Sequence, residues 1–170
     1  MKKETGFIIL TLLFFNNLVV AQNSENEKIK KSLLFIDIGG PGGYGSVNFG
    51  YQIRKINKLK FSSRFGLATY HLFDFNNHFN PDIIIPLGIN AYYGSKSNID
   101  FEFGQTISSI VYAEKNNYQS RRRTRLNTNF FIGYRYQSKQ GFLYKLGYAP
   151  LIENQKIFRH WASLTIGYNF

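Results

Sequence analysis

Residues 161–170 read WASLTIGYNF, and every second position of this stretch is apolar. The last residues of a soluble domain are usually frayed and polar, because nothing fixes them. In an extended chain, side chains point alternately to the two faces. One face here would carry Ala162, Leu164, Ile166, Tyr168 and Phe170. The alternation therefore predicts a β-strand that runs to the final Phe170.

The same two-residue alternation recurs upstream and is interrupted by turn residues. It predicts eight strands, at residues 33–39, 44–55, 59–70, 82–93, 98–112, 125–137, 141–149 and 160–170. Most of these segments reach the roughly 9 to 11 residues that a tilted strand needs to cross a bilayer. One face of the strands is nearly free of charge, whereas the other mixes glycines, amides and ions, although residues 33–39 and 59–70 alternate less cleanly.

The N-terminal region has a different composition. Lys2 and Lys3 precede an apolar run that ends in small residues at Ala21, which is the layout of a secretory signal peptide. We expect residues 1–21 to be removed, residues 22–32 to form a flexible leader, and residues 33–170 to form one domain. Loss of the signal peptide would change the net charge from +11 to +10, because Lys2, Lys3 and Glu4 leave with it. The chain has no cysteine, which excludes disulfides and thiolate chemistry.

The connections between predicted strands alternate in length. The long ones are residues 39–45 (GGPGGYG), 70–81, 113–124 and 150–159, and the short ones are 56–58, 94–97 and 138–140. Long outer loops and short periplasmic turns are typical of outer-membrane barrels. We therefore predict an all-β fold, an eight-stranded antiparallel up-and-down transmembrane β-barrel. Its last strand would pair with its first, because an open sheet edge in hydrocarbon leaves unpaired backbone groups.

Aromatic side chains are predicted at both membrane interfaces, where such barrels carry girdles. The periplasmic girdle would contain Tyr51, Tyr93, Tyr134, Tyr136, Tyr144, Tyr168 and Phe170, and the outer belt Tyr112, Tyr148 and Trp161.

An inverted alternative is a soluble lipocalin-like barrel that carries a small ligand in an apolar interior. The lipocalin-type Gly-x-Trp is missing from the first strand region, because the single Trp is Trp161. Ions also share a face with glycine and asparagine, which suits a crowded polar lumen. The membrane barrel is therefore favoured.

Four stretches resemble a known class of protein: IGGPGGYGSVNFGYQI (38–53), IIIPLGINAYYG (83–94), GYRYQSKQGFLYKLGYAPLI (133–152) and the closing WASLTIGYNF. The sequence resembles small eight-stranded outer-membrane barrels of the OmpA/OmpX type, and more closely a group of outer-membrane β-barrel proteins of Bacteroidota. The resemblance implies the fold and an outer-membrane location, and no enzymatic motif accompanies it.

Ionic residues predicted to face the lumen carry both signs. They are Asp37, Asp82, Asp100 and Glu102, with Lys60, Arg64, Arg135 and Lys145. Because an isolated buried ion is very costly, we expect them to form ion pairs that fill the lumen. A gated ion path or proton relay is the alternative. A general porin is disfavoured, since eight strands leave room for little more than side chains.

Catalysis and metal binding have little support. His71 with Asp74, or His160 with Ser163, could form an acyl-transfer pair of a lipid-modifying enzyme, but no Gly-x-Ser-x-Gly or His-x-Ser motif is present. No histidine or carboxylate cluster has metal-ligand spacing. The glycines of residues 39–45 predict a tight hairpin loop with positive φ rather than a phosphate loop. We expect no enzyme activity, no cofactor and no metal.

The third long connection is strongly basic. It carries Lys115, Arg121, Arg122, Arg123 and Arg125. On an exported protein such a run is not expected to bind nucleic acid; outer-leaflet lipid phosphates, including those of lipopolysaccharide, are the nearest polyanions. A solvated loop or a protein partner are the alternatives. We therefore predict a monomeric, non-enzymatic envelope protein that contacts outer-membrane lipids, and whose C-terminal strand contacts the barrel-assembly machinery.

Overall fold

The computed structural model describes residues 30–114, 119–153 and 157–170. The predicted signal peptide, most of the predicted leader, and Lys115 lie outside these ranges and stay predictions. The described elements are β1 (Ser32–Gly39), η1 (Gly40–Gly42), β2 (Gly45–Ile56), β3 (Leu59–Leu67), β4 (Ile83–Gly94), β5 (Ser97–Ala113), β6 (Ser120–Gln137), β7 (Phe142–Tyr148), β8 (Leu151–Glu153), β9 (Ile157–Arg159) and β10 (Ala162–Asn169). No helix among the described residues is long and apolar enough to cross a membrane.

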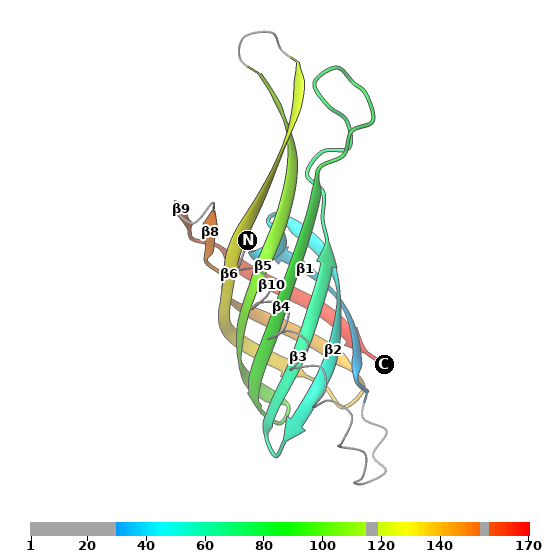
Figure 1. Cartoon of the computed structure of the whole chain (residues 1–170). Coiled ribbons are helices and arrows are strands. Elements are labelled where there is room, and N and C mark those ends of the chain that lie inside the picture. Colours follow the sequence, from blue (N-terminus) through cyan, green and yellow to red (C-terminus); the bar gives the residue numbers. More distant parts are fainter. Residues whose placement is uncertain (1–29, 115–118, 154–156) are drawn as a thin grey trace, which may run out of the picture.

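Eight strands close into one antiparallel barrel (Figure 1). Around the ring the order is β1, β2, β3, β4, β5, β6, β7 and β10, and β10 pairs with β1 from Leu33–Asn169 to Gly39–Ser163. Phe170 donates its backbone N–H to the Ser32 carbonyl at 2.9 Å. This closure satisfies the sheet edges, and it confirms the predicted eight-stranded up-and-down barrel.

The two faces of the sheet differ as the alternation predicts. Apolar side chains point outward, where Ile36 is 55% and Ile89 is 59% exposed. The buried interior positions are largely polar, including Asn48, Asn90 and Thr165. A lipocalin-like arrangement needs the opposite partition, an apolar interior, and is therefore not the one that this chain adopts.

The connection at residues 39–45 folds differently from the prediction. Positive φ angles at Gly39 (75°), Gly40 (78°) and Gly43 (80°) confirm the expected backbone conformation. The loop does not project outward, however. Its 3-10 turn η1 is buried and lies against β1, β2, β4, β5, β6 and β10, and Thr106 Oγ1 donates to the Pro41 carbonyl at 2.8 Å. The glycine-rich loop therefore turns inward and closes the lumen at the end of the barrel that carries the long loops.

The third long connection is another correction, because much of it is strand. Residues 110–113 of β5 pair with residues 120–123 of β6, and there neither strand pairs with any other described strand. The resulting two-stranded ribbon rises beyond the barrel (Figure 1). Alternation of apolar residues predicts β5 as far as Tyr112 but not the β6 half of the ribbon, because residues 120–123 (SRRR) carry no apolar side chain. The fourth connection likewise contains the β8–β9 hairpin.

The predicted aromatic positions fall at both ends of the barrel. Seven of the predicted aromatic side chains point outward at the short-turn end, and each is at least 36% exposed: Tyr51, Tyr93, Tyr134, Tyr136, Tyr144, Tyr168 and Phe170. At the long-loop end, the Tyr148 ring stacks on His160, and Trp161 packs edge-on against Tyr44. Tyr112 lies in the ribbon rather than at a common level with Tyr148 and Trp161. A role of these rings at membrane interfaces stays a prediction.

Candidate functional site: an ion-paired lumen and a basic mouth

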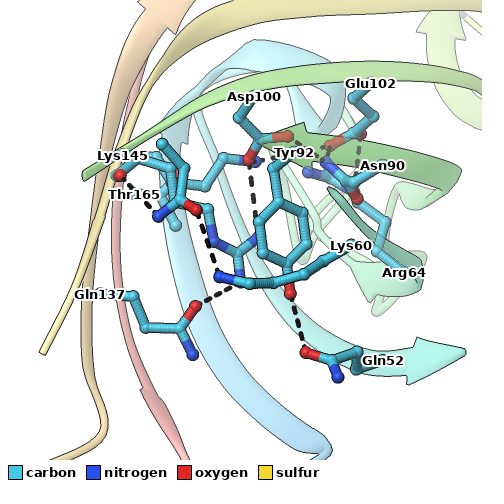
Figure 2. Close-up of polar contacts among 12 residues, drawn as sticks. Gln52, Lys60, Arg64, Asn90, Tyr92, Asp100, Glu102, Gln137, Lys145 and Thr165 are labelled. Carbon is cyan, nitrogen blue, oxygen red and sulfur yellow. Dashed lines mark hydrogen bonds and ion pairs between the residues drawn. The ribbon is translucent and has the colours of Figure 1, made fainter. Parts of the chain in front are cut away.

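Buried ion pairs fill the middle of the lumen. Arg64, from β3, contacts Asp37 Oδ2 at 2.8 Å through Nη1 and Glu102 Oε1 at 3.2 Å through Nε. Lys145, from β7, lies 3.0 Å from Asp100 and 3.7 Å from Glu102. Figure 2 shows the labelled Arg64 of β3 and Lys145 of β7 converging on Asp100 and Glu102, which both lie on β5. Arg135 Nη1 lies 3.5 Å from Asp100, so three cations and three carboxylates, each at most 4% exposed, form one electrically balanced cluster.

Neutral side chains complete this cluster, which we call the lumen network. Asn90 donates to Glu102 Oε2 at 2.7 Å, and Thr165 donates to Asp37. The Arg135 guanidinium lies 3.8 Å from the Tyr92 ring centroid, and Lys145 Nζ lies 4.3 Å from that of Phe131. Ring faces attract desolvated cations, so the aromatic side chains stabilise charges inside the barrel. These neutral partners were not among the predicted site residues, although their positions share the inward parity of Asp100 and Arg135.

Two of the eight residues predicted to form ion pairs in the lumen, Lys60 and Asp82, lie outside the lumen network. Lys60 Nζ reaches the Ser95 carbonyl and Asn98 Oδ1, both at 3.3 Å, and pairs with no carboxylate among the described residues. Asp82 lies at the long-loop end, where it accepts the Val111 backbone N–H at 2.8 Å and lies 3.0 Å from His71 Nδ1. Alternation gives the face of a strand but not the height in the barrel. Asp82 lies at the long-loop end, whereas Lys60 lies beside Tyr92 and lines the cavity at the short-turn end.

The two suggested catalytic pairs are not formed. His71 contacts Asp82 instead of Asp74, and His160 contacts the Tyr148 hydroxyl while Ser163 is buried. Asp74 is instead a turn residue. It accepts backbone N–H groups from Asn76 at 2.9 Å and from His78 at 3.0 Å. The bond from His78, more than any other interaction, holds the pKa of Asp74 below its ordinary value.

The basic run on β6 is divided by strand parity. Arg122 points outward and donates to the Ser109 carbonyl (3.1 Å), the Pro81 carbonyl (2.8 Å) and the Asn80 side chain. Arg121 pairs with Glu114 at 2.8 Å. Arg123 and Arg125 have the inward parity and line a cavity. The structure therefore separates four residues that the sequence analysis treated as one loop.

This cavity, which we call the mouth cavity, lies above η1 and has a volume of about 370 Å³. Pro41, Gly43 and Thr106 are among its lining residues, together with Ile110, Tyr112 and Leu151. The Tyr70 hydroxyl also contributes. Burial is the main reason that its pKa is raised, with smaller contributions from Tyr44, Glu153 and Asp82. Tyr70 therefore remains a neutral hydrogen-bond donor at neutral pH.

A second cavity, of about 620 Å³, opens at the short-turn end. Its lining residues include six lysines, Lys30, Lys55, Lys58, Lys60, Lys96 and Lys139. The lumen network and η1 separate this space from the mouth cavity.

Comparisons with known proteins identify the fold. No protein-family model matches the chain, and no curated protein matches it. Among solved structures, the N-terminal β-barrel domain of Pseudomonas aeruginosa OprF aligns with a TM-score of 0.56 and 14% identity, over 82% of this chain and 96% of that one. The attachment invasion locus protein Ail of Yersinia pestis aligns with a TM-score of 0.55 and 12% identity, over 82% of this chain and 95% of that one. The chain thus has the fold of the small eight-stranded outer-membrane β-barrels.

Proposed function

We propose that this protein spans the outer membrane as a closed, non-enzymatic barrel, and that its basic ribbon contacts anionic lipid phosphates. The observation that carries the proposal is the outward face of the barrel wall, which exposes apolar side chains on all eight barrel strands. In water such a surface would drive association, whereas a bilayer covers it. The likeness in fold to OprF and Ail supports the same location.

At the long-loop end, the point where the outward apolar residues stop supports a level for the lipid headgroups. On β5 and β6, the last outward apolar pair is Ile107 with Leu126, and the next outward pair is Ser109 with Thr124. Arg122 is the next outward residue of β6 after Thr124. Its guanidinium would lie at the level of the headgroups. Because both Nη atoms donate to Ser109, Asn80 and Pro81, a phosphate would be attracted by the positive charge of the guanidinium and by its Nε–H.

The filled lumen supports a barrel that does not conduct. Small barrels of eight strands have interiors that side chains can fill. Here the lumen network occupies the middle, and η1 closes the long-loop end. In planar bilayers we expect no steady current above that of the bare lipid. A stable, ion-selective conductance of the wild-type protein would contradict this part of the proposal.

Lipid contact can be tested with the full chain refolded in nanodiscs of phosphatidylcholine to which lipopolysaccharide is added. We expect Arg122→Ala to weaken lipopolysaccharide binding by about tenfold, the equivalent of one charge-assisted hydrogen bond. Arg122→Lys should restore part of the binding, since it keeps the charge. Arg54→Ala, at the opposite end of the barrel, is the matched control. Unchanged binding by a folded Arg122→Ala variant would overturn the proposed lipid contact.

We also propose that the protein is a monomer and that the barrel-assembly machinery contacts its C-terminal strand. The barrel closes within one chain through β1 and β10, so no second copy is needed to satisfy its edges. The outward row of Leu164, Ile166 and Tyr168 on β10 is the feature that we propose the barrel-assembly machinery contacts. Cross-linking in native membranes, with a photoreactive residue at position 166, would test that contact.

A further inference from the structure

The mouth cavity combines two chemical features that neither the barrel closure nor the lipid contact uses. Its lining residues include the apolar Ile84, Ile110 and Leu151, and also the guanidinium-bearing Arg123 and Arg125. Its volume of about 370 Å³ lies in the range of roughly 300 to 1,000 Å³ that is typical of small-molecule sites.

The carboxylates near this cavity are already engaged. Glu153 pairs with Arg159 at 3.5 Å, and Glu114 pairs with Arg121 at 2.8 Å. Asp82 accepts the Val111 backbone N–H and contacts His71. Within residues 30–114, 119–153 and 157–170, no carboxylate pairs with Arg123 or Arg125. The cavity wall therefore carries two positive charges that no described carboxylate contacts, because Glu153, which also lines the cavity, is paired with Arg159.

Aromatic groups lie beside these charges. The Arg123 guanidinium lies 5.9 Å from the ring centroid of Tyr112, a second lining residue. Tyr70, on another side of the cavity, is held by an edge-on contact with Tyr44 at 5.2 Å. A planar group that enters the cavity would find aromatic and aliphatic surfaces together with a neutral hydroxyl donor.

We infer that the mouth cavity binds one small amphiphilic anion, with a carboxylate, sulfonate or phosphate group on an aromatic body. The acidic group would accept hydrogen bonds from Arg123 and Arg125, and the aromatic body would occupy the space lined by Ile84, Ile110 and Tyr112. The site needs both features, because an anion alone would remain hydrated and an uncharged ring would leave the guanidinium groups uncompensated. This site does not depend on lipid contact through Arg122, which lies on the opposite face of β6.

Three soluble probes separate these contributions in calorimetric titrations of the protein in phosphatidylcholine nanodiscs, with empty nanodiscs as the blank. Naphthalene-2-sulfonate carries both features, 2-naphthol carries the ring, and inorganic sulfate carries the charge. We expect naphthalene-2-sulfonate to bind at one molecule per barrel and at least about tenfold more tightly than either of the others, since each lacks one set of contacts. Equal affinities for naphthalene-2-sulfonate and sulfate, or for naphthalene-2-sulfonate and 2-naphthol, would overturn the inference.

Variants then locate the site. Arg123→Gln with Arg125→Gln should weaken naphthalene-2-sulfonate binding by about tenfold or more. Lys31→Gln with Arg54→Gln, which removes the same charge at the opposite end of the barrel, is the matched control and should leave it unchanged. Ile110→Trp should block binding by filling the cavity without a change of charge. A heat-shift gel establishes that each variant is folded. Wild-type affinity in both the Arg123/Arg125 variant and the Ile110 variant would overturn the inference, even if Arg122 proves to bind lipid.

Discussion

Inward-facing arginines lie both in the lumen and at the mouth of this barrel, but they are paired with carboxylates only in the lumen. Arg64 and Arg135 lie in the lumen network, where carboxylates and aromatic rings surround them and almost no surface is exposed. Arg123 and Arg125 have the same inward parity but lie higher, where no described carboxylate pairs with them. The difference shows that inward parity alone does not decide what a charged residue does. What matters is whether carboxylates lie at the same height in the barrel. In the lumen they pair with the arginines and stabilise the fold, whereas at the mouth cavity the unpaired arginines are available to the anion that we propose.

The largest expected effect comes from unbalancing the lumen network. Asp100→Leu removes the carboxylate that contacts both Lys145 and Arg135. It leaves the buried Arg135 without a carboxylate partner and Lys145 with only the more distant Glu102, at 3.7 Å. We expect the free energy of unfolding to fall by about 3 to 5 kcal/mol, as when one partner of a buried pair is deleted. Urea titration in liposomes, followed by the heat-shift gel, measures this change.

The matched control for that variant is Asp74→Leu, which removes a carboxylate from a loop instead of from the lumen. It should change the free energy of unfolding by far less, because the cations of the lumen network keep their partners. Similar losses in the two variants would contradict the assigned difference between lumen and surface charges.

A double-mutant cycle on Arg64 and Asp37 sharpens the comparison. The single changes Arg64→Met and Asp37→Asn each leave a buried charge without a partner that lies 2.8 Å away. The double variant removes both charges, so its destabilisation should be smaller than the sum of the single effects by about 1 to 3 kcal/mol. The same cycle on Arg125 and Glu153 should give a coupling near zero. Additive effects at Arg64 and Asp37 would show that their contact does not stabilise the barrel.

Arg122 allows a smaller test, at the long-loop end. Its guanidinium joins β6 to the loop before β4, through the Asn80 side chain and the Pro81 carbonyl. Arg122→Ala should therefore increase the rate of limited proteolysis within residues 70–81 by roughly tenfold, because local opening becomes easier. Arg121→Ala is the matched control. Equal cleavage rates in the two variants would mean that the loop is held by other contacts.

The sequence could predict the barrel because its strongest signal, a period of two, is a property of each strand by itself. The closure of the last strand on the first then followed from the cost of open edges in hydrocarbon. The position of a side chain along the barrel axis could not be predicted from this period. Asp82 has the parity of the lumen residues but lies at the long-loop end, far along the barrel from Asp100. Lys60 lies beside Tyr92 and still contacts no carboxylate among the described residues.

Elements that lack this period were harder to predict. The β6 half of the ribbon, residues 120–123, carries no apolar side chain, so its arginines were assigned to a loop. The inward fold of η1 depends on contacts with six strands that only the closed barrel brings together. The glycines predicted its positive φ angles but not its direction.

The smallest expected effect concerns Asp74, a carboxylate in the loop between β3 and β4 that belongs to neither the lumen network nor the mouth cavity. Its pKa is held below the ordinary value mainly by the His78 backbone N–H, so the turn is stabilised while Asp74 is ionised. That contribution is fully present above the unfolded-state pKa and is lost as the pH falls through the lower, folded-state pKa. Amide exchange of Asn76 and His78, corrected for the intrinsic pH dependence, should show lower protection at acidic pH, and Asp74→Asn should remove this dependence. Because the turn lies on the surface, unfolding of the whole barrel should not change with it. A parallel loss of protection in the barrel strands would contradict the assignment of this acid sensitivity to the turn.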